Sequence, residues 1–159
     1  MKVFFPFMKI PLSKHKFAVV DSRDRELVCR YRWHAKQNKS GIWYAVTTDL
    51  QTRHKVYLHR LLMGFPSCDV DHRDRDGLNN CRRNLRLATK SQNAANSKTR
   101  LGISGRKGVC RHKNTIRWVA RIRLGGRKTH LGVFNTQKEA AEAYNAAAVL
   151  CFGSFARGS

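Results

Sequence analysis

The sequence predicts an α+β protein built from small antiparallel sheets and short helices. Three observations lead to this class. Residues 1–55 contain short β-type runs separated by turn residues, and residues 56–97 follow a strand–turn–strand–helix pattern. Residues 107–159 combine a strict two-residue alternation with an alanine-rich helical pattern. Between the last two parts, residues 98–106 are rich in Ser, Gly and basic residues without apolar periodicity, which predicts a linker.

The first part, residues 1–55, is predicted to be a β-rich scaffold. Phe17–Val20 is a β-type run, and residues 27–31 alternate with the period of a second strand. Ile42–Thr48 is expected to pair with His54–Leu58 through a polar turn. The scaffold should lead directly into the chemically richer segment that follows.

Three aromatic residues of this region stand among basic residues, and such rings can stack on nucleic-acid bases. They are Trp33, Trp43 and Tyr44. In so short a segment aromatic side chains more often build the core, so core packing is the favoured interpretation.

The second part begins with one or two helical turns at His59–Gly64, and Cys68–His72 is predicted to be the first strand of a hairpin. Asp76-Gly77 is a strong turn dipeptide. Leu85 and Leu87 then alternate in a second strand.

A helix start closes this part of the chain. Thr89 is predicted to be the N-cap, with Gln92 reaching back in a capping box. Asn93 then falls in the first turn of the helix, and the pattern should bring it to the same side of the hairpin as Asp71 and His72.

The chemistry of Asp71, His72 and Asn93 points to metal-assisted hydrolysis. Carboxylate and amide oxygens are hard ligands that suit magnesium or manganese rather than zinc. A neutral imidazole next to such a cation can act as the general base for a water molecule. The expected reaction is hydrolysis of nucleic acid with one divalent cation, magnesium or manganese.

The stretch LHRLLMG…VDHRDRDGLNNCRRNLRLATKSQNAAN resembles the HNH homing endonucleases of phages and their relatives, which have the ββα-metal fold. The resemblance implies that Asp71 is a metal ligand and His72 the general base. It also implies that Asn84, twelve residues after the base, braces the hairpin, and that Asn93, twenty-one residues after it, is the second metal ligand. The third signature position is Asn here instead of His.

Basic residues around the hairpin are candidates for phosphate contacts. Arg82, Arg83 and Arg86 flank Asn84 and are predicted to hold phosphates, the alternative being a solvated basic loop. His59 and Arg60 form a family-like pair at a helix start. They either touch DNA or only cap structure, and the sequence does not decide between the two.

The third part, residues 107–159, predicts three strands and a helix. The strands are expected at Val109–Arg111, Arg117–Leu124 and Thr129–Phe134, with Gly125-Gly126 as a hairpin turn. A second capping box, Thr136–Glu139, opens the helix, and Gly153 ends it.

Alternation along residues 117–124 places Trp118, Ala120, Ile122 and Leu124 on one sheet face and a row of arginines on the other. Small side chains such as Ala140, Ala143 and Ala147 let the helix lie close to the first face, with Tyr144 and Trp118 filling the remainder. The arginine face is then free, and such a sheet can enter the major groove of duplex DNA.

This unit resembles the Apetala-two/ethylene-response-factor DNA-binding domain through KGV, WVARIR, HLGVF, the T-x-x-E-A-A-x-A-Y helix and the terminal FGSFA. Arg121 and His130 stand where the plant domains often have Glu and Trp, so groove binding but not base preference carries over. The alternative is a solvated basic face on a structural domain. By the resemblance, the DNA-contacting residues would be Lys107, Arg111, Arg121, Arg123, Lys128 and His130.

Composition agrees with a polyanionic partner. The 159 residues carry 32 Lys or Arg and 10 Asp or Glu, a formal charge of +22. Five cysteines without a C-x-x-C pair favour neither a disulfide framework nor a zinc ribbon. No cleavable leader and no eighteen-residue apolar run is found, so a cytoplasmic protein of a phage-infected or bacterial cell is expected, not a secreted one.

The sequence thus predicts a homing-type, metal-dependent DNA endonuclease. With one site per chain it should nick one strand of a target located by the C-terminal sheet. Double-stranded DNA is the expected partner, with no membrane, small-molecule substrate or obligate protein partner. The alternatives are a DNA-binding transcription regulator with a lapsed nuclease core and, on size and charge alone, an RNA-binding protein of ribosomal character.

Overall fold

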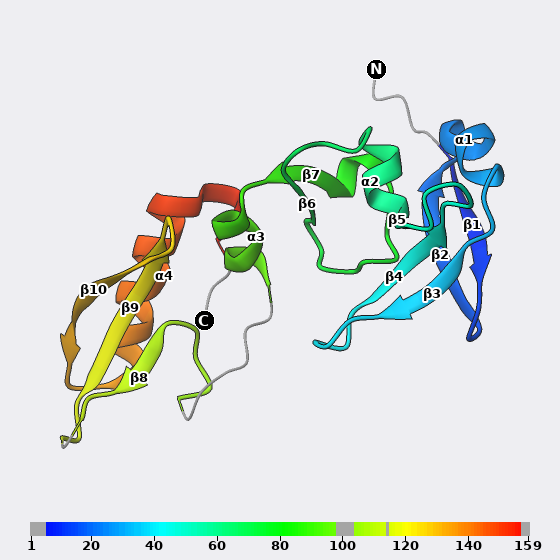
Figure 1. The fold of residues 1–159 in the computed structure, drawn as a ribbon. Coiled ribbons are helices and arrows are strands. Elements are labelled where there is room, and N and C mark those ends of the chain that lie inside the picture. Colours follow the sequence, from blue (N-terminus) through cyan, green and yellow to red (C-terminus); the bar gives the residue numbers. More distant parts are fainter. Residues whose placement is uncertain (1–5, 98–103, 114, 157–159) are drawn as a thin grey trace. The chain divides into compact units, whose positions relative to one another are not determined.

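The computed structural model describes residues 6–97, 104–113 and 115–156, and it confirms the predicted α+β class. The chain divides into two compact units, one ending at Ala88 and one beginning at Thr89. Figure 1 shows their elements in sequence colours. Within the described ranges, no helix is long and apolar enough to cross a membrane.

The first unit contains three small antiparallel sheets, ordered β1–β2, β3–β4–β5 and β6–β7. The predicted hairpin of residues 42–58 is confirmed as the pair β4 and β5. The strands are β1 (Phe7–Leu12), β2 (Lys16–Asp21), β3 (His34–Gln37), β4 (Trp43–Thr48), β5 (Lys55–Tyr57), β6 (Asp69–His72) and β7 (Leu85–Ala88).

One apolar core joins these sheets to helix α2 (Leu58–Leu62), which overlaps the helical turns predicted at His59–Gly64. Trp33 is a buried member of this core, and its indole N–H donates to the Val28 carbonyl at 3.0 Å. The favoured interpretation of Trp33 as a core residue is therefore confirmed. Burial of its large ring removes it as a base-stacking platform.

The strand predicted for residues 27–31 was wrong. Residues Arg25–Cys29 form a short helix, α1, which follows the 3-10 turn Ser22–Asp24. Only Val28 of this helix is buried. A half-buried strand would bury every second side chain of residues 27–31. The helix buries only one, so the alternation in the sequence does not correspond to alternating burial.

The second unit contains a three-stranded antiparallel sheet in the order β10–β9–β8, as predicted. Helix α4 (Gln137–Phe152) packs on it through small side chains, with Ala140, Ala141 and Tyr144 buried, and ends at Gly153 with φ +52°. The strands are β8 (Val109–Arg111), β9 (Trp118–Leu124) and β10 (Arg127–Phe134).

Both predicted helix starts are present, with one difference. Thr89 and Gln92 form a complete capping box at the start of α3 (Lys90–Asn96). Thr136 accepts from the Glu139 backbone N–H, but the Glu139 carboxylate accepts from the Asn135 N–H instead of from Thr136. The second box is therefore half formed.

Helix α3 lies in the second unit, after the division at Ala88. Its Ala95 is buried against Ile122, Tyr144 and Phe152 of the C-terminal domain. The predicted linker of residues 98–106 falls mostly outside the described residues, but Ser104 is buried and its hydroxyl donates to the Val109 carbonyl. Helix α3 therefore belongs to the same compact unit as the C-terminal sheet.

Candidate active site and nucleic-acid interface

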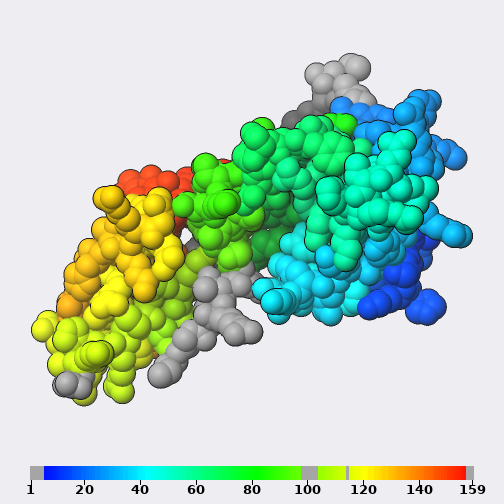
Figure 2. Space-filling view, viewed as in Figure 1, coloured from blue at the N-terminus to red at the C-terminus, as the bar shows by residue number. Residues whose placement is uncertain are grey.

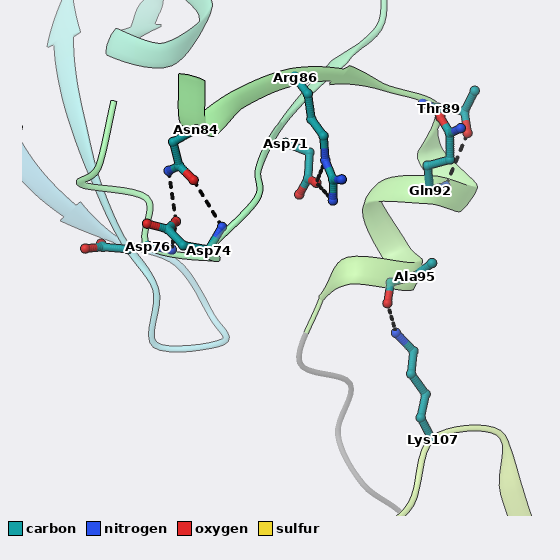
Figure 3. Close-up of polar contacts among 9 residues, drawn as sticks. All are labelled: Asp71, Asp74, Asp76, Asn84, Arg86, Thr89, Gln92, Ala95 and Lys107. Atoms are coloured by element: carbon teal, nitrogen blue, oxygen red, sulfur yellow. Dashed lines mark hydrogen bonds and ion pairs between the residues drawn. The ribbon is translucent and has the colours of Figure 1, made fainter. Parts of the chain in front are cut away.

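Asp71 and His72 are the last two residues of β6, and both are buried, each with 5% of its surface exposed. β6 pairs with β7 so that Asp71 lies opposite Arg86. The guanidinium of Arg86 contacts one carboxylate oxygen, Oδ2, through Nε and Nη2, each at 2.8 Å (Figure 3). The carboxylate is therefore charge-compensated inside the hairpin.

The imidazole of His72 lies in a cluster of rings from three elements. The centroid of His59, on α2, is 5.0 Å away, and that of Tyr44, on β4, is 6.0 Å away. Burial lowers the pKa of His72 from its ordinary value, against the opposing effects of its hydrogen bond to the Asn80 oxygen and of nearby carboxylates. His72 is therefore neutral at pH 7 and able to accept a proton.

Asn84 holds the loop between β6 and β7 at three places. Its amide nitrogen donates to the Asp74 carboxylate at 2.9 Å, and its oxygen accepts from the Asp74 N–H at 3.1 Å (Figure 3). The amide nitrogen also donates to the Asn79 carbonyl at 2.7 Å. Although burial opposes it, hydrogen bonds from Asp76, Asn84 and Asn79 lower the pKa of Asp74. These are the contacts of a loop brace.

The same loop is attached to the N-terminal scaffold. The Val19 N–H donates to the Leu78 carbonyl at 2.8 Å, and the Asn80 N–H donates to the Val19 carbonyl at 2.7 Å. Gly77 lies so close to β4 that a Cβ there would come within 2.4 Å of the Trp43 carbonyl oxygen. The scaffold therefore fixes the loop from the side of β2 and β4.

The three arginines predicted to hold phosphates have different surroundings. Arg82 forms an ion pair with the buried Asp24, with Nη2 to Oδ1 at 2.7 Å, and Arg86 is the buried partner of Asp71. Arg83 is exposed. Arg82, which is half-buried, and Arg86 thus have structural carboxylate partners, whereas Arg83 is the most exposed of the three.

His59 and Arg60 also have internal contacts. His59 has 9% of its surface exposed and packs against Tyr44, Tyr57 and His72. Arg60 donates to the carbonyls of Cys68 at 3.2 Å and Pro66 at 2.5 Å. Both residues therefore have structural contacts within the first unit.

Asn93 lies in the middle of α3, and its backbone N–H donates to the Thr89 carbonyl at 2.9 Å. Its proposed role as a metal ligand depends on its spacing in the sequence. Near the end of α3, the Lys107 ammonium donates to the Ala95 carbonyl at 2.5 Å (Figure 3) and to the Ala94 carbonyl at 2.8 Å. Lys107 therefore caps the helix that carries Asn93.

Four of the six residues expected to contact DNA share one exposed face of the C-terminal sheet. His130 lies opposite Arg121 and Lys128 opposite Arg123, so the four side chains point to the same side of the hairpin β9–β10 (yellow in Figure 2). Arg111 lies opposite Trp118, with its guanidinium 5.5 Å from that ring, on the sheet face that bears α4. Lys107 caps α3, so neither it nor Arg111 belongs to this basic face.

Among the described residues, no group of three or more His, Cys, Asp or Glu side chains converges as a metal site. The donor set nevertheless suits magnesium or manganese, which commonly keep several waters and need only one or two protein carboxylate or amide oxygens. Asp71 supplies such an oxygen in a buried position.

Asn80 was missed by the sequence analysis. It is completely buried, and its side-chain oxygen lies 3.3 Å from Nε2 of His72. The polar run in which it stands looks like exposed turn residues, so the only available signal is its position in the loop between the two strands. The pairing of Arg82 with Asp24 could not be predicted from a local pattern either, because 58 residues separate the two side chains.

Comparisons with known proteins agree with this site. A family model described as HNH endonuclease matches residues 65–95. An uncharacterized HNH endonuclease of Acanthamoeba polyphaga mimivirus is 35% identical over 157 residues, which cover 94% of this chain and 78% of that relative.

Two plant proteins are similar over 50 residues, or 30% of this chain. An ethylene-responsive transcription factor of Arabidopsis thaliana is 48% identical, and an AP2-like ethylene-responsive transcription factor of Oryza sativa subsp. japonica is 54% identical. The chain spans only 12% and 8% of the length of these two factors.

The buried acid–imidazole pair, its braced loop and these similarities define an endonuclease. The chain belongs to the HNH endonuclease family. The predicted resemblance to HNH endonucleases is thereby confirmed, together with a partial similarity to plant AP2/ERF-like factors.

Proposed function

We propose that this protein is a metal-dependent DNA endonuclease of homing type that nicks one strand at a target located by its C-terminal sheet. The observation that carries the proposal is the buried Asp71–His72 pair at the end of β6, with a neutral imidazole held in a fixed ring cluster. Membership of the HNH family and the +22 charge support a nucleic-acid substrate.

In this mechanism the imidazole of His72 takes a proton from the attacking water. Asp71 and Asn93 would hold one divalent cation, magnesium or manganese, through their side-chain oxygens, and the cation would supply stabilisation of negative charge on the phosphodiester. The carboxylate is held by Arg86 and the loop by Asn84, so neither needs to reorganise during the reaction. Arg83 is exposed next to this loop and is proposed to contact phosphate.

The basic face of the C-terminal sheet, defined by Arg121, Arg123, Lys128 and His130, is proposed to bind the DNA duplex. A two-stranded ribbon fits the major groove, and exposed cations release counterions from the phosphates. Because the chain has one such Asp–His pair, we propose a nick for each binding event. In this proposal these residues bind the target, whereas the chemistry depends on Asp71 and His72 of the first unit and on Asn93 of α3.

Cleavage of supercoiled plasmids from a host-genome library tests the proposal. Wild-type protein with magnesium or manganese should give relaxed circles, and a chelator should abolish them. His72→Ala should reduce nicking by about 10²- to 10⁴-fold, the range for loss of a general base, with unchanged DNA binding in gel shifts. Sequencing the nicked ends would identify the target, and nicks that persist in His72→Ala would contradict the proposal.

One observation favours the alternative of a DNA-binding regulator with a lapsed nuclease core. Oδ2 of Asp71, the carboxylate assigned to the metal, is already held by Arg86 through two contacts of 2.8 Å. Under this alternative, gel shifts would show DNA binding, but no nicking would occur with either cation. A competition between duplex DNA and RNA would test the RNA-binding alternative in the same assay.

A further inference from the structure

The hydrogen bond between Asn80 and the catalytic imidazole has a defined direction. The Asn80 oxygen lies 3.3 Å from Nε2 of His72, and either atom could in principle donate or accept. The orientation of the Asn80 amide decides which. This orientation can be inferred from the other contacts of the same side chain.

The amide nitrogen of Asn80 has two carbonyl partners. It donates to the Leu78 carbonyl at 3.0 Å and lies 3.4 Å from the Gly77 carbonyl. Exchanging the amide oxygen and nitrogen would place an oxygen against two carbonyl oxygens in a completely buried position, which is strongly unfavourable. The oxygen therefore faces His72 and can only accept.

The backbone makes this orientation rigid. The Asn80 N–H donates to the Val19 carbonyl at 2.7 Å, and the Leu78 carbonyl accepts from the Val19 N–H as well as from the amide. The ring of His72 is in turn packed against His59 and Tyr44. Neither partner can turn without breaking buried contacts.

We infer that Asn80 is a positioning residue that keeps the proton of neutral His72 on Nε2, so that Nδ1 is the atom that accepts the proton of the attacking water. A neutral imidazole exists as two tautomers, and a buried acceptor next to Nε2 selects the one protonated there. The assignment of Nδ1 as the base depends on the proposed function, whereas the assignment of the tautomer does not.

Nitrogen NMR of histidine-labelled protein, without metal or DNA, tests the tautomer directly. In the wild type, Nε2 of His72 should resonate in the protonated range and Nδ1 in the unprotonated range. Asn80→Leu keeps the volume but removes the acceptor, so the two signals should move towards an averaged position. Asn80→Asp keeps the acceptor oxygen towards His72, and its second oxygen can face the Leu78 and Gly77 carbonyls only as a protonated O–H, the form that burial favours. In that neutral form it should retain the wild-type pattern, which matters if the leucine variant folds poorly.

Asn79→Ala is the matched control. Asn79 is the neighbouring amide of the same loop and donates to Asp74 at 2.6 Å, so its loss weakens the loop without removing the acceptor of His72. This variant should keep the wild-type tautomer. An equal loss of the tautomer in Asn79→Ala would show that general loosening of the loop, and not Asn80, is responsible.

Steady-state nicking adds a functional measurement. Asn80→Leu should lower kcat by about 10- to 100-fold, as expected for an outer partner of a catalytic histidine, with KM for DNA unchanged. Asn80→Asp should recover part of this loss. A wild-type proton on Nδ1, or a fall in kcat without a change of tautomer, would overturn the inference. Because the NMR needs no activity, an inactive wild type would refute the proposed function alone.

Discussion

The arginines around the Asp71–His72 pair and those on the C-terminal sheet have similar sequence surroundings but different surroundings in the fold. Arg82 and Arg86 are each paired with a buried carboxylate of the first unit. Arg121 and Arg123 are exposed on one strand of the second unit, opposite His130 and Lys128.

The difference shows that sheet register decides what a basic residue does. Arg86 alternates with Leu85 and Leu87 in the same way that Arg121 alternates with Ala120 and Ile122. Arg86, however, lies opposite an aspartate, whereas Arg121 lies opposite another basic-type residue, His130. Cross-strand neighbours of opposite charge favour an internal ion pair, and like neighbours favour an external anion.

Among substitutions that test this difference, the largest loss of stability is expected at Arg86. Arg86→Met should lower the free energy of unfolding by about 3–5 kcal/mol, because the Asp71 carboxylate would remain buried without its partner. Urea titration measures this loss. Manganese or magnesium should then raise the Tm of the variant more than that of the wild type, since the cation would replace the missing charge.

Arg83→Met serves as the control for Arg86, because Arg83 is exposed in the same segment. It should change the free energy of unfolding by less than about 0.5 kcal/mol. If the metal raised the Tm of Arg86→Met no more than that of the wild type, the role of Asp71 as a ligand would be contradicted.

A smaller change in stability is expected from the pH dependence of His59, which packs against the rings of Tyr44, Tyr57 and His72 in the first unit. Burial, and then the charges of His72 and Arg60, lower the pKa of His59 to about 3. The unfolded chain therefore binds a proton at His59 below its ordinary pKa of about 6.5, whereas the folded chain does not. Stability from this group is present above that pH and is lost as the pH falls towards 3.

Urea titrations between pH 7 and pH 4 would measure this dependence. His59→Gln should flatten it by up to about 1.4 kcal/mol per pH unit, the maximum for one proton. His72 would keep part of the dependence, because burial lowers its pKa too. An unchanged slope in His59→Gln would contradict the inferred burial of a neutral imidazole.

The smallest effects distinguish the basic face from the cap of α3 in the second unit. Arg121→Ala and Arg123→Ala should each reduce the salt dependence of DNA binding by about 0.9 in log–log slope, one phosphate contact apiece, without destabilising the fold. Lys107→Met should leave that slope unchanged. It should instead lower the stability of the second unit by about 1 kcal/mol, through loss of a charged group at a helix C-terminus.

Fluorescence anisotropy at several salt concentrations, together with thermal unfolding, measures both quantities. The resemblance to plant domains implies that Lys107 contacts DNA. In the structure its ammonium instead donates to the Ala94 and Ala95 carbonyls at the end of α3. A reduced salt slope in Lys107→Met would favour the original prediction.

Local patterns were sufficient to predict most of the elements. The strict alternation of residues 117–124 and the capping box at Thr89 both depend on neighbours in the sequence, and both are present in the structure. The helix at Arg25–Cys29 was missed, because five residues contain too few periods to distinguish a strand from a helix.

The candidate site could be predicted only in part. The spacing of Asp71, His72 and Asn84 in the family motif identified the hairpin and its loop brace, whose contacts the structure shows. The partners of Arg82 and Arg86 and the contact of Asn80 with His72 depend on pairing between distant segments. Such pairing follows from the register of the hairpin and from the scaffold, which no local pattern specifies.

The packing of α3 has a consequence for exchanging domains between enzymes of this kind. Ala95 is buried among Ile122, Tyr144 and Phe152, and Lys107 caps the same helix. A chimera joined after Asn96 would thus give α3 a foreign neighbour and expose its apolar side. A junction at Ala88, where the two compact units divide, would instead transfer α3 together with its own support. Under the proposed function, recombination at this breakpoint should change the DNA target while moving Asn93 together with the transplanted domain.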